Sequence, residues 1–156
     1  STGSRISELH FDDNSIVNID GVGLVVDGTS AGEVLYGTEA ADTINGLDGN
    51  DQLWASNGDD VLNGGGGADI LYAQGGDNRF VFDALTDSTE TSTDSLYYFD
   101  QGGEIIDFSG IASIDEFSDL TISEAGGFTH VDDDGSDFSI KIFGSFTLTA
   151  SDFIFV

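Results

Sequence analysis

The segment from Gly28 to Val81 reads GTSAGEVLY, GTEAADTIN, GLDGNDQLW, ASNGDDVLN, GGGGADILY and AQGGDNRFV, which are six nine-residue blocks in continuous register. The eighth position is apolar in every block: Leu35, Ile44, Leu53, Leu62, Leu71 and Phe80. The sixth position carries a carboxylate or an amide: Glu33, Asp42, Asp51, Asp60, Asp69 and Asn78. Glycine dominates the first and fourth positions. A short, fixed period of this kind predicts a stacked repeat architecture.

The composition of each block predicts its local structure. Five or six residues rich in Gly, Asp and Asn favour a turn, and about three residues around the apolar position favour a short strand. Two blocks then make one coil of a flattened parallel β-roll, with strands on opposite faces and the apolar side chains meeting inside. Blocks two apart stack at roughly 4.8 Å, the spacing of neighbouring strands.

This stacking places the sixth-position acids one above another. Two carboxylates at that spacing repel by about 3.5 kcal/mol at an effective dielectric of 20. The whole chain carries 30 Asp and Glu against three Lys and Arg, a net charge of −27, which further opposes a compact state. A divalent cation between stacked turns reverses the sign of this term. Oxygen ligands favour Ca²⁺, and the absence of cysteine excludes a thiolate site.

The blocks GLDGNDQLW and GGGGADILY resemble the G-G-x-G-x-D-x-U-x nonapeptides of RTX proteins, which bind calcium in a parallel β-roll. The resemblance implies that sixth-position side chains and turn carbonyls hold one Ca²⁺ between blocks two apart. The pairs Asp42 with Asp60 and Asp51 with Asp69 are expected to be the best sites. The outer pairs, which include Glu33 and Asn78, are expected to be weaker, because the blocks there depart from the pattern. The further metal-binding candidates are Gly37, Glu39, Gly46, Asp48, Gly49, Asn57, Gly58, Gly64, Gly66 and Gly67.

The flanks of the repeat differ from it. Residues 1–27 are predicted to be capping strands, at Ser15 to Ile19 and Gly23 to Val26, with Val17 and Val26 keeping the nine-residue step. The repeat unit itself is taken as 28–82. Residues 83–156 alternate apolar and polar side chains, which predicts an antiparallel β-sheet region packed with the roll. Its expected strands are 94–99, 104–108, 120–123, 128–131, 138–143 and 151–156. The predicted fold class is therefore all-β.

The stretch after the repeat also resembles the carboxy-terminal domain of serralysin-type proteases and of alginate C5-epimerase R-modules. In those relatives an Asp followed by a short apolar end belongs to a type I secretion signal, and Asp152 to Val156 looks similar. The resemblance implies a secreted, extracellular protein. The purely structural interpretation, in which these residues form a last core strand, is compatible with a role in secretion.

Several patterns do not support a catalytic or additional metal site. Residues 28–32 match G-x-S-x-G, but the strand, helix and histidine that a nucleophile elbow needs are not indicated. Neither His10 nor His130 has a plausible nucleophile partner. Asp132, Asp134 and Asp137 resemble half an EF-hand loop without the bidentate Glu, which favours a hairpin turn. The spacing of Asp94, Asp100 and Asp107 is not specific, so we expect no calcium site there.

The sequence therefore predicts a non-catalytic module that folds on binding several Ca²⁺ ions outside the cell. Its expected partners are calcium, amino-terminal domains of a larger parent chain, and a type I secretion apparatus. The charge argues against nucleic acid, and no apolar run approaches the roughly 20 residues of a membrane span. No amino-terminal signal peptide is visible. The alternative is polysaccharide binding through an aromatic ladder of Tyr36, Trp54 and Tyr72, unless other strands cover that ladder.

Overall fold

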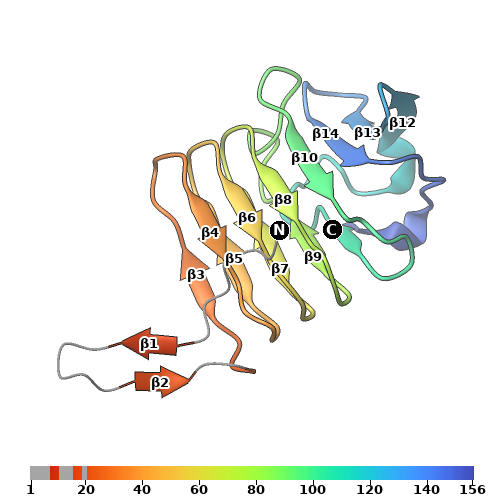
Figure 1. Ribbon diagram of the computed structural model, residues 1–156. Coiled ribbons are helices and arrows are strands. Elements are labelled where there is room, and N and C mark those ends of the chain that lie inside the picture. The colour runs from red at the N-terminus through yellow and green to blue at the C-terminus, as the bar shows by residue number, and fades with distance from the viewer. Residues whose placement is uncertain (1–7, 11–15, 19–20) are drawn as a thin grey trace.

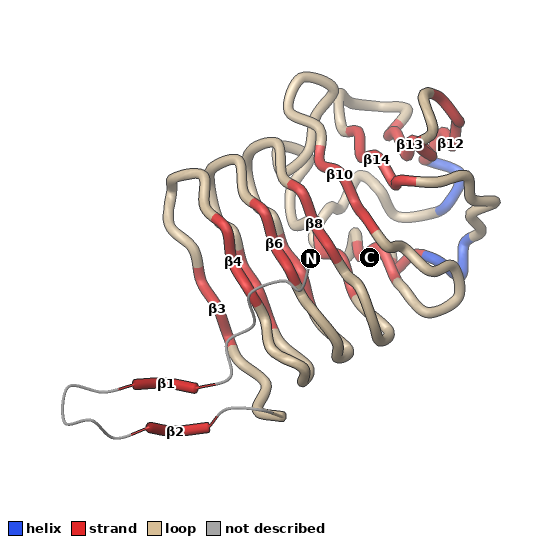
Figure 2. Tube along the Cα trace, in the orientation of Figure 1, coloured by secondary structure: helices blue, strands red, loops and turns tan. Residues whose placement is uncertain are grey.

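The computed structural model describes residues 8–10, 16–18 and 21–156, and among them it is all-β apart from two short 3-10 turns. Three-residue strands make up the repeat region: β3 (Val25–Asp27), β4 (Val34–Tyr36), β5 (Thr43–Asn45), β6 (Gln52–Trp54), β7 (Val61–Asn63), β8 (Ile70–Tyr72) and β9 (Arg79–Val81). Each strand follows one glycine-rich turn, so a nine-residue block yields one turn and one strand. Figure 2 shows these short strands joined at both ends by long turns.

Two parallel sheets form the two walls of the roll. The strands β4, β6 and β8 lie side by side in one wall, and β3, β5, β7 and β9 in the other (Figure 1). Leu35 pairs with Leu53 and Leu53 with Leu71, which is the predicted stacking of blocks two apart. The inward eighth-position side chains from Ile44 to Phe80 are fully buried between the walls. The predicted parallel β-roll is therefore confirmed.

Both walls continue beyond the repeat. In one wall, β10 (Asp94–Tyr97) pairs with β8, and in the other, β11 (Ile105–Asp107) pairs with β9. The last strand, β15 (Phe153–Ile154), follows the 3-10 turn η2 (Ala150–Asp152) and pairs with β11. All three of these pairings are parallel, so the prediction of antiparallel strands is wrong for these segments. Alternation of apolar and polar residues fits either direction, and strands this short carry no further signal.

The antiparallel prediction is confirmed for the hairpins that follow. Strands β12 (Leu120–Ala125), β13 (Phe128–Asp133) and β14 (Ser139–Phe143) pair in antiparallel order, after the 3-10 turn η1 (Phe117–Asp119). Strand β14 then pairs in parallel with β10, which joins the hairpins to one wall in a seven-stranded sheet. Figure 1 shows this group of strands at the carboxy-terminal end of the roll.

The amino-terminal strands only partly follow the prediction. Strand β3 carries Val26 opposite Ile44, so this part of the nine-residue step is confirmed. Strand β2 (Ile16–Asn18) instead pairs antiparallel with β1 (Glu8–His10) in a separate two-stranded sheet, where Val17 lies opposite Leu9. The predicted continuation of the step to Val17 is therefore wrong. Ser15 and Ile19, the predicted ends of that strand, lie outside the described residues.

Candidate calcium-binding site

The sixth-position side chains form two rows, each just before the strands of one wall, and they are buried from Asp42 to Asn78. In one row the main-chain N–H of Glu33 donates to Oδ1 of Asp51, and that of Asp51 donates to Oδ1 of Asp69, both at 2.7 Å. In the other row, Asp42 donates to Oδ1 of Asp60 at 2.7 Å, and Asp60 donates to the Oδ1 of Asn78 at 3.0 Å. The stacked block geometry thus fixes one oxygen of each side chain on the backbone of the coil before it.

The second carboxylate oxygen of the central acids is left without a partner. Oδ2 of Asp51, Asp60 and Asp69 is buried and has no hydrogen bond, and each residue is only 1% exposed. A buried carboxylate oxygen without a partner is unfavourable, because its lost hydration is not replaced. These atoms fit a cation site, because a divalent ion would supply the missing charge and coordination.

Burial also changes the acidity of these groups. Loss of hydration raises the pKa of Asp60 from 3.8 to about 7 and that of Asp69 to about 6, and repulsion from Asp42 and Asp51, respectively, adds to the shift. The same burial raises the pKa of Asp51, with a further contribution from Glu33. The fold without a cation therefore favours protonated acids, whereas a cation needs them ionised.

The turns beside the central acids share an unusual backbone conformation. Gly49, Gly58 and Gly67, all at the fourth position, have φ between 129 and 143°, which only glycine adopts readily. At the second position Leu47 and Ser56 have φ of 75 and 82°. These conformations turn successive peptide groups through the tight curve of the block, and main-chain carbonyls in such turns are typical Ca²⁺ ligands.

Hydrogen bonds join two pairs of these turns. The N–H of Gly49 donates to the carbonyl of Gly66, and the N–H of Gly66 donates to the carbonyl of Leu47, both at 2.8 Å. In the matching pair, the N–H of Gly58 donates to the carbonyl of Gly75 at 3.1 Å, and the N–H of Gly75 donates to the carbonyl of Ser56 at 3.0 Å. The third-position residues also form parallel bridges, Asp48 with Gly66 and Asn57 with Gly75. The candidate glycines Gly46 and Gly64 lie against Oδ2 of Asp51 and Asp69, where an added Cβ would come within 2.6 and 2.4 Å of that oxygen.

The first two turns are built differently. Ala31 and Ala40 occupy the fourth position, and neither has a positive φ. Oδ2 of Asp42 accepts a hydrogen bond from the Thr38 main chain, and Oε2 of Glu33 accepts one from Thr29 at 2.5 Å. Both acids thus have a protein partner for their second carboxylate oxygen. The corresponding oxygen of Asp51, Asp60 and Asp69 in the later blocks has none. Asn57 donates to Glu39 across these turns at 2.6 Å. The ranking of the pairs, with Asp42 and Asp60 among the best, stays a prediction.

Both rows continue past the repeat, which the spacing did not indicate. Oδ1 of Asp94 accepts from the Asp69 main chain at 2.8 Å, while its Oδ2 is buried without a partner. Burial and the neighbouring Asp69 raise the pKa of Asp94 to about 9. In the other row Glu104 accepts from the Asn78 side chain at 3.2 Å. The resemblance of Asp94-Ser95-Leu96-Tyr97 to Asp69-Ile70-Leu71-Tyr72 is a signal that could have revealed Asp94.

The predicted aromatic ladder is present on the outer face of one wall. Tyr36 and Trp54 stack with ring centroids 6.5 Å apart, and Trp54 and Tyr72 stack at 3.8 Å. The ladder continues through Tyr97, 5.2 Å from Tyr72, to Phe143, another 5.2 Å away. The three predicted residues are half-buried, whereas Phe143 is 54% exposed.

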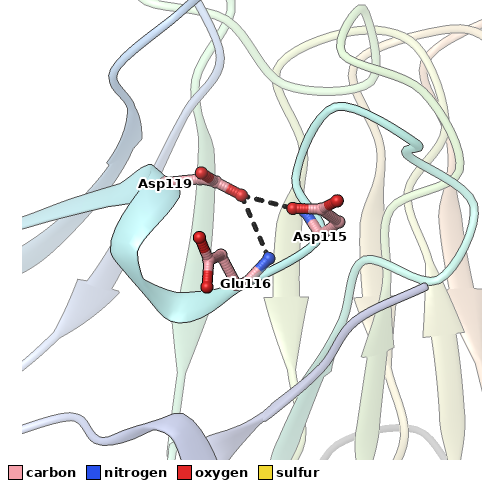
Figure 3. Close-up of side chains that lie close together, drawn as sticks. All are labelled: Asp115, Glu116 and Asp119. Carbon is pink, nitrogen blue, oxygen red and sulfur yellow. Dashed lines mark hydrogen bonds between the residues drawn. The ribbon is translucent and has the colours of Figure 1, made fainter.

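One further acidic group lies outside the rows. Figure 3 shows Asp115, Glu116 and Asp119 close together, with the main-chain N–H groups of Asp115 and Glu116 both donating to Oδ2 of Asp119. Their carboxylates lie near one another at the surface, at the start of η1. These hydrogen bonds cap a short turn, and no orphaned buried oxygen accompanies them.

The sequence patterns set aside as chance have ordinary roles here. Ser30 lies in the turn between β3 and β4, so residues 28–32 lack the strand-to-helix context of a nucleophile elbow. His130 lies on β13, with its ring nitrogen 3.3 Å from the Ala125 carbonyl. Asp107 pairs with Arg79 at 3.2 Å. Among the described residues, no helix is long and apolar enough to cross a membrane.

The fold and the acid rows define the repeat region as a calcium-binding β-roll. Residues 27–62, 46–80 and 54–88 match the family model of the RTX calcium-binding nonapeptide repeat. The segment from 27 to 88 is therefore a run of RTX repeats, as the resemblance of its blocks implied. Comparison with curated protein sequences gives no match.

Solved structures share the fold over most of the chain. The AlgE6R2 and AlgE6R3 subunits of the Azotobacter vinelandii mannuronan C5-epimerase both superpose with a TM-score of 0.67, at 22% and 26% identity. Each match covers 83% of this chain, and 91% and 81% of the respective subunit. The extracellular lipase LipA from Serratia marcescens matches at a TM-score of 0.64 and 20% identity, over 85% of this chain. The match spans only 21% of the lipase.

Proposed function

We propose that this chain is a non-catalytic module that folds when its RTX repeats bind Ca²⁺ outside the cell. The observation that carries the proposal is the set of buried, partnerless carboxylate oxygens of Asp51, Asp60 and Asp69. Without a cation these acids repel one another inside the fold, and a net charge of −27 adds to the strain. Binding energy then becomes folding energy, because the site does not exist in the unfolded chain.

The residues that would hold the ions are the sixth-position acids and the carbonyls of the glycine-containing turns. The central blocks, with Asp51 and Asp69 in one row and Asp60 in the other, fit this role best. Asp94 extends the set, since its Oδ2 is orphaned in the same way. When bound, Ca²⁺ supplies positive charge between stacked carboxylates. The protein itself supplies the turns, which hydrogen bonds between neighbouring coils hold together.

The same coupling gives the module a role in export. Extracellular calcium sites bind with dissociation constants of about 10⁻⁴ to 10⁻³ M, so such a chain is unfolded at cytosolic calcium and folds outside. The type I secretion assignment for residues 152–156 rests on the resemblance of that stretch. One of the similar structures is an extracellular lipase, which supports an extracellular location and a place within a larger chain.

Circular dichroism of the full chain, with calcium, with magnesium and with a chelator, tests the proposal. We expect sheet structure and cooperative melting only with calcium, because Mg²⁺ demands a smaller, near-octahedral site. A chelated chain that keeps the same spectrum and the same melting temperature would refute calcium-driven folding. The calcium-free sample must be dialysed rather than merely diluted, so that tightly held ions are removed.

A second candidate function is glycan binding at the aromatic face, favoured by two exposed rings. Phe143 ends the ladder, and Tyr98 lies beside Tyr72 with ring centroids 6.2 Å apart. Two of the similar structures belong to an enzyme named for mannuronan, a polysaccharide. The stacked rings of Trp54 and Tyr72 cover each other's faces, so the middle of the ladder offers little stacking area. The net charge favours a neutral glycan over an acidic one. Calorimetric titration with a neutral and with an acidic glycan, at fixed calcium, shows which kind of glycan binds.

A further inference from the structure

The roll contains three Asn-Gly pairs, at residues 45–46, 57–58 and 63–64, and all three are held in the same way. The Asn45 side-chain amide donates to Asp27 at 2.6 Å, and that of Asn57 donates to Glu39 at 2.6 Å. The Asn63 amide donates to Asp83 at 2.8 Å. Each acceptor lies on a neighbouring coil, so these bonds exist only when the coils are stacked.

Asn-Gly is the dipeptide in which the side-chain carbonyl carbon is most open to attack by the following main-chain nitrogen, because glycine has no Cβ to block it. The glycine nitrogen loses its proton to solvent and bonds to the Asn Cγ. The Cγ–Nδ2 bond breaks, and the nitrogen leaves as ammonia with a proton from water, which leaves a five-membered imide. Water then opens the imide at either carbonyl, giving aspartate or isoaspartate. The net change consumes one water and releases one ammonia.

The folded roll opposes the attack that begins this reaction. Asn45 and Asn63 end strands β5 and β7, so their backbone is extended and their amides are tied to a neighbouring acid. The attacking nitrogen is also engaged at two of the pairs. The N–H of Gly46 donates to the Asn63 carbonyl at 2.8 Å, and the N–H of Gly58 donates to the Gly75 carbonyl at 3.1 Å. A locally unfolded chain loses all of these restraints together.

We propose that Asn45, Asn57 and Asn63 are sites of spontaneous deamidation that the fold suppresses and that unfolding opens. Asn57 is the most reactive of the three in the folded chain, because it is exposed and lies in a turn rather than in a strand. The modification is irreversible in plain buffer, so the fraction of deamidated molecules increases with the time that the chain spends unfolded.

Deamidation of Asn57 has a structural consequence. The product replaces an N–H donor with a second carboxylate facing Glu39, which exchanges an attraction for a repulsion. An isoaspartate also inserts one carbon into the main chain of this turn, where Gly58 and Gly75 hold two stacked turns in register. A chain modified at this position therefore refolds into a less stable roll.

The test follows deamidation of the full chain by peptide mass spectrometry, folded in native buffer and unfolded in urea, with calcium present in both samples. In urea we expect conversion at all three Asn-Gly pairs and little at Asn50 or Asn78, which precede Asp51 and Arg79. In the folded chain, conversion at Asn45 and Asn63 should be slower by at least ~10-fold. Equal rates in the two samples overturn the proposal. Because urea rather than chelation unfolds the chain, the result does not depend on calcium-driven folding.

The variant Glu39→Ala tests the tethering acid directly. We expect faster conversion of Asn57 in the folded variant and no change at Asn45, whose acceptor Asp27 is intact. The matched variant Glu39→Gln keeps a side-chain oxygen as acceptor and should stay close to the unmodified rate. An unchanged Asn57 rate in folded Glu39→Ala contradicts the tethering role. If this variant does not fold, the comparison of folded and urea-unfolded wild-type chain still decides the proposal.

Discussion

The main-chain N–H of Asp51 donates to Oδ1 of Asp69 across 2.7 Å, while the Oδ2 atoms of both carboxylates are buried without a partner. One oxygen of Asp69 is thus bonded to the backbone of the neighbouring coil, and the other has no protein partner. Asp60 in the other row has the same arrangement, with one oxygen bonded to the backbone and one buried without a partner. Both rows therefore contain buried carboxylate oxygens without a partner. Stacking the repeats brings the acids close together, and their repulsion is relieved either by protonation or by a bound cation.

Replacing Asp69 with Asn should have opposite effects with and without calcium. The amide keeps an oxygen for the Asp51 N–H but carries no charge. With calcium we expect a loss of about 1 to 3 kcal/mol in the free energy of unfolding, because a charged ligand is gone. In a chelated sample the variant should be at least as stable as wild type, since a buried charge is removed. Urea unfolding in calcium measures the first effect. Circular dichroism of the chelated chains measures the second, as sheet structure in the variant equal to or greater than that of wild type. Asp137→Asn, at an exposed acid on a hairpin loop, is the control.

Stability without calcium should rise as the pH falls. The pKa of Asp60 is raised to about 7 and that of Asp69 to about 6 in the fold, against 3.8 ordinarily. A raised pKa means that the folded chain binds protons more tightly, so this contribution is complete below pH 3.8 and is lost as the pH rises through 6 to 7. Circular dichroism of the chelated chain across this range measures the effect, as sheet structure that is absent at neutral pH and appears as the pH falls.

Less self-repulsion at low pH also stabilises the whole chain. The double variant Asp60→Asn with Asp69→Asn therefore separates the two contributions, because it should lose part of the pH dependence. A pH dependence identical to wild type would assign the effect to net charge alone. Calcium binding should show the opposite trend, with affinity rising with pH and protons released on binding.

Gly67→Ala should disrupt the central turns. Gly67 has a φ of 143°, and an added Cβ would lie 1.5 Å from the Gly49 carbonyl oxygen, so the stacked turns must separate. We expect a loss of more than about 3 kcal/mol and weaker calcium binding. Gly126→Ala is the matched control, because Gly126 has a φ of 63° and nothing within 4 Å of an added Cβ. That change should cost about 1 kcal/mol. Similar losses in the two variants would show that the turn contact does not matter.

Trp54→Ala should lower stability and leave glycan binding unchanged. Trp54 stacks on Tyr72 at 3.8 Å and on Tyr36 at 6.5 Å, so its loss opens a gap in the ladder. We expect a cost of about 2 to 3 kcal/mol, below the range for a fully buried aromatic residue. Thermal melting and glycan titration of the calcium-loaded variant measure both properties. Lost glycan affinity at unchanged stability would instead assign the ladder to recognition.

Much of the roll could be predicted from the sequence because nine-residue periodicity fixes both register and face. The pairing of Leu35 with Leu53 and the burial of Asp51 follow directly from it. The extension of the rows could not be predicted this way. Asp94 lies 25 residues after Asp69, seven more than the 18 that separate Asp51 from Asp69, so the inserted residues hide it from a periodic search.

Strand direction and turn conformation were also beyond the sequence. Apolar and polar alternation placed β10 and β11 in the sheet but could not show that they run parallel to the roll. Leu47 and Ser56 adopt a positive φ that their side chains do not favour. Their neighbours Gly49 and Gly58 form hydrogen bonds to the next stacked turn. These contacts between coils, rather than the local sequence, impose the conformation. Such tertiary constraints leave no mark on local composition.

Hydrogen exchange at the main-chain amides that donate to the acid rows tests the central claim most directly. The amides of Glu33, Asp42 and Asp51 each bond to an acid one coil further on. If calcium drives folding, these amides are strongly protected in calcium and exchange at the rate of an unfolded chain after chelation. Equal protection in both conditions would mean that the acid rows are stable without a cation, which contradicts calcium-driven folding.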